Sequence, residues 1–175
     1  MCPTKPDQSW QIDMTSFELS DLRRVYLTVV IDCFSRQIVG WTLDPRCRAS
    51  EWIAAVRQRL EFRRRLSPES CGGLVLRSDN GAQPCSRKFV AFLSQHGIKG
   101  EYTGYDAPDD NAFVEPVIRT IKAEEVWLNS YQSFHEAHQA IENYINFYNQ
   151  ERIHQSREYK TPNEIAAPFS NLNAA

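Results

Sequence analysis

Apolar and polar residues alternate near the start of the chain. Over residues 10–15 every second side chain is apolar, which is the period of a β-strand and places Asp13 on the side away from the apolar residues. Residues 25–32 are almost continuously apolar, and residues 37–43 follow after a polar turn. We therefore predict three strands in an antiparallel meander, with the most apolar run at its centre.

The pattern then changes to helical spacing. Apolar residues after Ser50 recur at the helical period, so Ser50 is a candidate N-cap of a helix. A short apolar run predicts a strand at 74–78. Ser86 is expected to cap a second helix that ends at Gly97, and a further strand is predicted at 98–102.

The second half of the chain is predicted to be helical after a loop over residues 100–110. A helix over 113–122 places its apolar residues on one arc. Two capping boxes then open a long helix and a short one: Ser133 with Glu136, and Thr161 with Glu164. The order of three strands, helix, strand, helix, strand and further helices indicates a mixed α/β domain.

Length and composition are those of a single domain, because 175 residues with 42% hydrophobic content are enough for one real core. A net charge of −2 and a pI near 6.1 exclude DNA binding by bulk charge, so any contact with nucleic acid must come from local patches. One candidate patch, for which a solvated helix face is the alternative, consists of Arg57, Arg59, Arg63, Arg64 and Arg65.

The five cysteines are odd in number and include no close pair, so neither a disulfide framework nor a zinc knuckle is indicated. No apolar run approaches the roughly 20 residues of a membrane span. The first residues also lack the basic and apolar regions of a signal peptide. We expect an intracellular protein with no membrane partner.

Three carboxylates are candidates for metal chemistry. Asp13 lies on the polar side of the first strand, and Asp79 follows the strand at 74–78 at an Asn-Gly turn, the end of a strand where α/β sheets bind ligands. Glu115 shares one helix face with Arg119 and Lys122. Hard divalent cations prefer carboxylate oxygens, and positive side chains beside them suit a phosphate backbone.

The residues around these carboxylates resemble the catalytic core of bacterial insertion-sequence transposases and retroviral integrases, the DDE family. Thirty-five residues separate Asp79 from Glu115, which is the spacing of that family. The resemblance covers about residues 10–167. It is carried by Trp-x-x-Asp-x-Thr from Trp10, Ser-Asp-Asn-Gly from Ser78, Asp-Asp-Asn-Ala-x-x-Glu from Asp109, and a tail with Tyr148-Asn149-x-x-Arg152-x-His154 and Thr161-Pro162-x-Glu164.

The resemblance implies a ribonuclease-H-like α/β fold, in which a mixed five-stranded sheet is flanked by helices. It implies that Asp13, Asp79 and Glu115 are the catalytic and metal-binding residues, holding two Mg²⁺ (or Mn²⁺) ions, with Asp13 shared by both. The implied reaction is phosphodiester hydrolysis at transposon ends followed by strand transfer, with no covalent protein intermediate. The residues expected to contact DNA are Asn80, Arg119, Lys122 and Arg152.

The resemblance also implies an organisation and partners. Residues 1–9 are expected to be a linker or cloning remnant, 10–168 the catalytic core and 169–175 a tail. The implied partners are the transposon ends, the target DNA and further copies of the chain assembled on DNA. In the resembling transposases a helix-turn-helix region precedes this core, and we expect it to be missing here. The implied location is the cytoplasm or the nucleoid.

Several alternatives stay open. The same chemistry would serve a ribonuclease H-type or structure-selective nuclease, and a catalytically silent core would serve as a DNA-binding or assembly module. Arg152 and His154 either contact DNA or hold the last helices against the core. Asn80 and Gln83 either reach a nucleotide or support the metal ligand Asp79.

Two local features bear on the carboxylates. Asp32 is a competing acid at a strand end, but the Ser-Arg turn that follows predicts that it caps this turn. Pro116 departs from the family pattern, because proline disfavours helical geometry in the residue before it. The helix is therefore expected to begin at Pro116 with Glu115 as its cap, or to be kinked there, and Glu115 is expected to be able to turn away.

Overall fold

A single mixed sheet forms the centre of the protein. The computed structural model describes residues 3–66, 73–102 and 112–170. Its strands lie in the order β3-β2-β1-β4-β5, and the β1–β2 and β2–β3 pairs are antiparallel whereas the β1–β4 and β4–β5 pairs are parallel. The strand bounds are β1 Ser9–Glu18, β2 Arg24–Asp32, β3 Ile38–Asp44, β4 Val75–Ser78 and β5 Lys99–Tyr102. The predicted meander and the mixed five-stranded sheet are confirmed.

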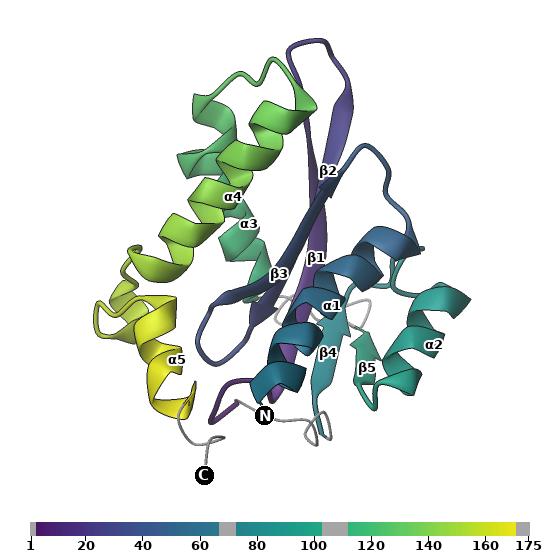
Figure 1. Cartoon of the computed structure of the whole chain (residues 1–175), viewed down its shortest axis with the longest axis vertical. Coiled ribbons are helices and arrows are strands. Elements are labelled where there is room, and N and C mark those ends of the chain that lie inside the picture. The colour runs from purple at the N-terminus through teal and green to yellow at the C-terminus, as the bar shows by residue number, and fades with distance from the viewer. Residues whose placement is uncertain (1–2, 67–72, 103–111, 171–175) are drawn as a thin grey trace.

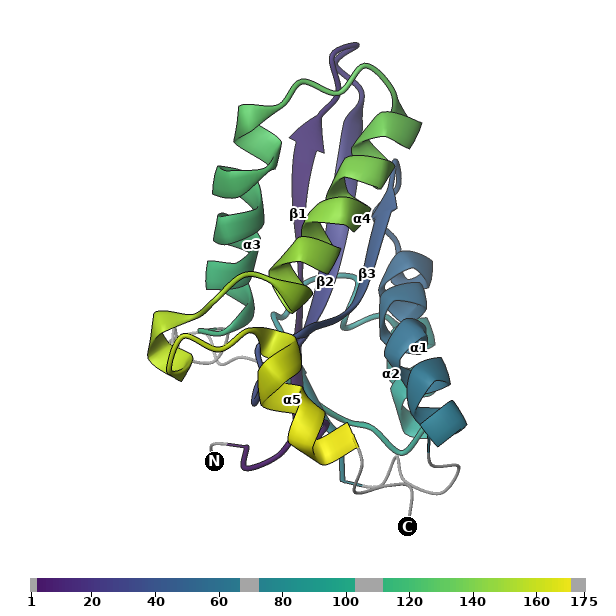
Figure 2. The same cartoon turned by 60° about the vertical axis from the view of Figure 1, so that its left-hand side comes forward.

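Helices cover both faces of this sheet (Figure 1). Their bounds are α1 Ala49–Leu66, α2 Arg87–Gln95, α3 Val114–Glu124, α4 Phe134–Gln150 and α5 Pro162–Ser170, with short 3-10 helices η2 Val126–Leu128 and η3 Gln155–Arg157. The turned view in Figure 2 shows α3 and α4 over one face and α1 and α2 over the other. No helix in the described ranges is both long and apolar enough to span a membrane.

Each face of the sheet has its own apolar core. Trp10 and Ile12 of β1 pack with α1 and α2, whereas Val29 and Ile31 of β2 pack with α3 and α4. Asp13 lies on the face of β1 opposite Trp10 and Ile12, as predicted. This opposite face also carries an apolar core, because α3 and α4 cover it.

Local capping signals mostly hold. Ser86 accepts a hydrogen bond from the N–H of Phe89 at the start of α2, and Gly97 has a φ of +64° just after the end of that helix. The predicted capping box at the start of α5 is present, since Thr161 and Glu164 bond reciprocally. At the start of α4 Ser133 accepts the N–H of Glu136 as predicted, but the Glu136 carboxylate accepts the N–H of Gln132 instead of that of Ser133. The expectation for Ser50 is wrong, because α1 begins at Ala49 and Glu51 instead accepts the N–H of Arg48.

The predicted loop over residues 100–110 is only partly testable. Its first residues belong to β5, which runs to Tyr102, so the loop begins later than expected. Residues 103–111 lie outside the described part of the chain.

Candidate active site

Asp13 is half-buried in the middle of β1, the central strand of the sheet. Its Oδ1 accepts a hydrogen bond from the N–H of Met14 at 2.7 Å. The pKa of Asp13 is raised to about 6, chiefly by burial; the hydrogen bond from Met14 opposes this rise, and the charges of Asp79 and Glu115 add to it. The three carboxylates singled out in the sequence are therefore close enough to interact electrostatically.

Asp79 reaches Asp13 through the parallel pairing of β1 with β4. Gln11 lies opposite Arg77 in that register, so Asp13 and Asp79, each two residues further on, come side by side at the carboxyl end of β4. The N–H of Gly81 donates to Oδ1 of Asp79 at 3.1 Å, as in a turn closed by an aspartate side chain. A Cβ at Gly81 would lie 3.0 Å from the same oxygen, so glycine allows this close approach.

Glu115 lies within the first turn of α3, which begins at Val114 and runs on through Pro116. The expectation that the helix starts at Pro116 with Glu115 as its cap is therefore wrong, whereas the alternative of a kink at Pro116 stays a prediction. Pro116 is tolerated inside α3 because the N–H groups of a first helical turn have no partner within the helix, so proline removes no hydrogen bond there. The Glu115 side chain is exposed.

Gln11 is a residue that the sequence analysis missed. Its side-chain oxygen accepts hydrogen bonds from the N–H groups of Phe113 and Val114, both at 3.0 Å. Phe113 itself supplies no side-chain cap, so Gln11 of β1 caps α3 from across the fold. Gln11 thereby fixes the helix turn carrying Glu115 to the strand carrying Asp13. Its only sequence signal is a polar residue on the same side of the strand as Asp13.

The donor set suits hard divalent cations, since it consists of carboxylates. Among the residues that the structure describes, no three His, Cys, Asp or Glu side chains converge closely enough to hold a metal ion. Asp13 lies in β1 and Asp79 directly after the adjacent strand β4, whereas Glu115 is exposed on the helix that covers this face of the sheet. Cation binding would therefore require the three side chains to draw together.

The basic residues expected to contact DNA have different surroundings. Arg119 is exposed and Lys122 is half-buried, and in the described part of the chain neither pairs with a carboxylate. Arg152 binds Glu124 through Nε and Nη2, at distances down to 2.7 Å. This pair joins the end of α4 to the end of α3, which favours a packing role for Arg152.

Asn80 and Gln83, which follow Asp79, have different surroundings. Asn80 is exposed. Gln83 donates to the backbone oxygen of Cys47 at 3.3 Å and to its sulfur at 3.2 Å. The Gln83 amide therefore holds the segment before α1, which neither of the two roles considered for it had anticipated.

Asp32 has the predicted turn-capping role. It is buried, and its carboxylate accepts the N–H groups of Asp7, Phe34 and Ser35 together with the Ser35 hydroxyl. Four hydrogen bonds occupy its oxygens, so Asp32 is not a candidate metal ligand.

The arginines of α1 do not form one patch. Arg59 and Arg63 both pair with Asp7, at 3.0 and 3.7 Å, and their side chains are only 13% and 14% exposed. They hold the segment before β1 against α1, whereas Arg57 lies over the ring of Phe92. The side chains of Arg64 and Arg65 lie outside the described set.

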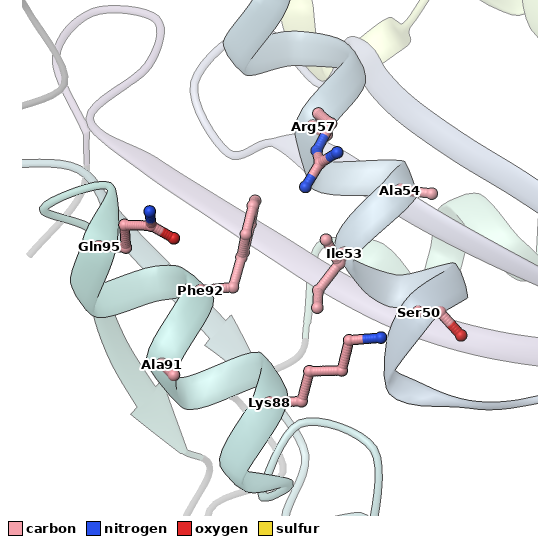
Figure 3. Close-up of a pocket in the computed structure, with 8 residues that line it drawn as sticks. All are labelled: Ser50, Ile53, Ala54, Arg57, Lys88, Ala91, Phe92 and Gln95. Carbon is pink, nitrogen blue, oxygen red and sulfur yellow. The ribbon is translucent and has the colours of Figure 1, made fainter.

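A cavity of about 460 Å³ lies between α1 and α2. Figure 3 shows Ile53 and Phe92 at its centre, with Arg57 on one side of them and Lys88 on the other. It is on the face of the sheet opposite α3, so it is separate from the carboxylates.

Comparisons with known proteins agree with this geometry. The family model described as "Integrase core domain" matches residues 3–105, and a second model of that description matches residues 96–162. The chain is 31% identical over 169 residues to the transposase for insertion sequence element IS904 of Lactococcus lactis, covering 93% of the chain and 62% of that protein. It is also 31% identical over 171 residues to the transposase InsF for insertion sequence IS3A of Escherichia coli, covering 97% of the chain and 56% of that protein.

Solved structures show the same fold at low sequence identity. A chain of the simian T-cell lymphotropic virus intasome gives a TM-score of 0.70 at 19% identity, over 95% of this chain and 56% of that one. The BIV integrase catalytic core domain gives 0.67 at 17% identity, over 97% and 99%. The fold is therefore the ribonuclease-H-like fold of retroviral integrase cores.

The chain spans less than two thirds of the length of the curated relatives it matches, including 55% of the putative transposase InsK for insertion sequence element IS150 of Escherichia coli. All of them are transposases of bacterial insertion sequences. Together with the two family models, these matches show that the chain belongs to the integrase core domain family, on the side of the bacterial insertion-sequence transposases.

Proposed function

We propose that this chain is the catalytic core of a DNA transposase that hydrolyses a phosphodiester at each transposon end and joins the freed 3′-hydroxyl to target DNA. The observation that carries the proposal is the placement of three carboxylates: Asp13 lies in β1, Asp79 directly follows the neighbouring strand β4, and Glu115 lies in the helix turn that Gln11 of β1 caps. Grouping carboxylates raises their free energy in the absence of cations, so such a group is typical of a functional site.

Asp13, Asp79 and Glu115 would hold divalent cations, Mg²⁺ or Mn²⁺. When bound, two such ions supply positive charge to the attacking and leaving oxygens of an in-line displacement. Without a cation the raised pKa of about 6 means that Asp13 holds its proton more tightly than an ordinary aspartate, and a bound cation would displace that proton. Water is the nucleophile of the first step and the DNA 3′-hydroxyl that of the second, so no side chain becomes covalently attached.

Arg119 and Lys122 are proposed to hold the phosphates next to the cleaved bond. They lie four and seven residues after Glu115 on the same helix, and neither is neutralised by a described carboxylate. Asn80 is proposed to contact the nucleotide beside Asp79. Nε and Nη2 of Arg152 bind Glu124, so Arg152 would contact DNA only through Nη1.

DNA and further copies of this chain are the proposed partners. The net charge of −2 gives the chain little general attraction for DNA, so synapsis of two ends is proposed to depend on oligomers and on parts of a longer protein. One neighbour is part of an intasome, and HTLV-2 integrase cores were solved with magnesium in dimeric and trimeric forms. The proposed location is where the chromosome lies, in the cytoplasm or nucleoid.

The decisive experiment supplies a branched duplex that mimics the strand-transfer product, because the reverse reaction can be followed without pairing two ends. The wild-type chain is expected to resolve this duplex with Mg²⁺ or Mn²⁺. Asp79→Asn is expected to lower the rate of this reaction at least about a hundredfold. Its melting temperature is expected to equal that of the wild type. Lys99→Gln, which alters an exposed pair away from the carboxylates, is the control.

Two results would redirect the proposal. Cleavage of an RNA–DNA hybrid in preference to the branched DNA would indicate a ribonuclease H-type enzyme. Absence of any metal binding, with Asp79→Asn indistinguishable from wild type on every substrate, would indicate a silent DNA-binding or assembly module.

A further inference from the structure

Four basic side chains gather where the β2–β3 turn meets the end of α4 and η3. They are Arg36 of that turn, Arg152, His154 and Arg157. The pKa of Arg36 is lowered to about 10, first by burial and next by the charge of Arg157. The pKa of His154 is lowered by burial and then by Arg152, Arg36 and Arg157. Hydrogen bonds join the same regions, since the Asn149 side chain near the end of α4 binds both backbone groups of Ile38, so residues more than a hundred positions apart in sequence face one another.

Protein carboxylates neutralise little of this charge. Glu124 pairs with Arg152 at 2.7 Å, so one of the four has a full ion pair. Asp32 lies near Arg36, but its oxygens are occupied by hydrogen bonds from the turn. In the part of the chain that the structure describes, Arg36 and Arg157 have no ion pair.

Two nitrogens of this cluster also lack hydrogen-bond partners. Nη1 of Arg36 and Nε2 of His154 are buried, and within the described residues neither has a partner. A buried polar atom without a partner destabilises the folded state, because it has lost its hydrogen bonds to water. Such atoms are rare in native proteins, and each calls for an explanation such as a missing ligand.

The cluster lies next to the start of α3. The Arg36 guanidinium is 3.3 Å from the centre of the Phe113 ring, and Phe113 is the residue whose N–H donates to Gln11. Glu115 follows two residues later. An anion bound by this cluster would therefore lie beside the helix turn that carries Glu115, and on the same side of the sheet as Arg119 and Lys122.

We propose that Arg36, His154 and Arg157 form a binding site for a phosphate of the DNA backbone, separate from the carboxylates. A guanidinium fork matches phosphate oxygens in geometry and charge, and the histidine ring adds one N–H donor. The stacking of Arg36 on Phe113 holds one fork in place before DNA arrives. Arg152 positions the cluster through Glu124. This inference rests on the proposed function, because it takes DNA as the ligand.

The test measures how DNA affinity depends on salt. A short fluorescein-labelled duplex is titrated in EDTA with the whole chain over a series of salt concentrations. Each phosphate contact that is lost lowers the slope of log affinity against log salt by about one. Arg36→Gln and Arg157→Gln are each expected to lower it by that amount. Arg24→Gln, an exposed arginine paired with Glu18 at the far hairpin, is the charge-matched control and should leave the slope unchanged.

Folding is monitored separately, since Arg36 packs on Phe113. Arg36→Lys keeps the positive charge, so it is expected to retain most of the salt dependence of DNA affinity. The affinity itself should fall about tenfold, because lysine lacks the guanidinium fork. Slopes equal to wild type in both glutamine variants would overturn the phosphate site. An equal decrease of the slope in the Arg24→Gln control would also overturn the phosphate site.

The outcome is distinguishable from that of the proposed function. Active resolution of branched DNA with unchanged slopes would leave the transposase proposal standing and reject the phosphate site. Slopes that fall in the two variants, in a chain that no metal activates, would support the phosphate site and reject catalysis.

Discussion

The side-chain oxygen of Gln11 accepts the backbone N–H of Val114 at 3.0 Å, across 103 positions of sequence. It also accepts the N–H of Phe113, so one amide side chain satisfies two donors at the start of α3. Gln11 is 1% exposed. The contact joins the strand of Asp13 to the helix turn of Glu115, and the distance between these two carboxylates depends on it.

Replacing Gln11 by methionine keeps the volume of the side chain but removes the acceptor. We expect the free energy of unfolding to fall by about 1–3 kcal/mol, because two buried N–H groups lose their partner. Mn²⁺ affinity should fall as well, since the first turn of α3 is released. Chemical denaturation and Mn²⁺ titration measure the two effects.

The matched control is Gln58→Met. Gln58 also bridges two backbone groups, the N–H and the oxygen of Trp41, but it is exposed on the opposite face of the sheet. Its replacement should lower stability less and leave Mn²⁺ affinity unchanged. Equal losses of Mn²⁺ affinity in the two variants would refute the positioning role of Gln11.

Asp13→Asn should make the metal-free protein more stable at neutral pH. The folded pKa of Asp13 is about 6 against an ordinary value of 3.8, so the folded state holds this proton more tightly than the unfolded state. Wild-type stability therefore falls as the pH rises from about 4 to about 6 and stays lowered above that range. The asparagine variant lacks this loss and should gain about 1–3 kcal/mol above pH 6.

Urea denaturation in EDTA at pH 4, 5, 6 and 8 measures this gain. It should grow through the acidic range and then remain constant. Addition of Mg²⁺ should stabilise the wild type and leave the variant unchanged, because only the wild type has the charged ligand. A variant that is less stable than wild type at pH 8 in EDTA would contradict the burial of a charged Asp13.

What the sequence could and could not reveal depends on the range of the interaction. Strand alternation, the Ser86 cap and the capping box of Thr161 with Glu164 act over a few residues, so the pattern contains them. The cap that Gln11 gives to α3 spans over a hundred residues and leaves no periodic signal. Family spacing predicts the three carboxylates as the site, but only the pairing of β1 with β4 explains why Asp79 lies beside Asp13.

The pair of Arg152 with Glu124 gives another prediction. Because Nε and Nη2 of Arg152 both bind Glu124, and Tyr144 donates to the same carboxylate at 2.6 Å, Arg152→Met should lower stability by about 1 kcal/mol. The double variant with Glu124→Gln should lose less than the sum of the two single losses. A double-mutant cycle in urea measures this coupling.

DNA binding by the same variants separates packing from DNA contact. If Arg152 mainly joins α4 to α3, Arg152→Met should weaken DNA binding less than Arg119→Met does. A tighter complex in Glu124→Gln, together with a weaker one in Arg152→Met, would instead show that Glu124 competes with DNA for this arginine.

Gly81 provides the most direct control over the Asp79 carboxylate. A Cβ at this position would lie 3.0 Å from Oδ1 and 3.2 Å from Oδ2, closer than such atoms normally approach. Gly81→Ala should therefore push the carboxylate away from Asp13 and weaken Mn²⁺ binding about tenfold, with a change in stability of less than about 1 kcal/mol because the turn is at the surface. Gly100→Ala is the matched control, since its nearest neighbour is the flexible end of Leu93 at 3.3 Å. Electron paramagnetic resonance of free Mn²⁺ measures the affinity of both variants, and unchanged binding in Gly81→Ala would mean that Asp79 does not hold the cation from the position seen here.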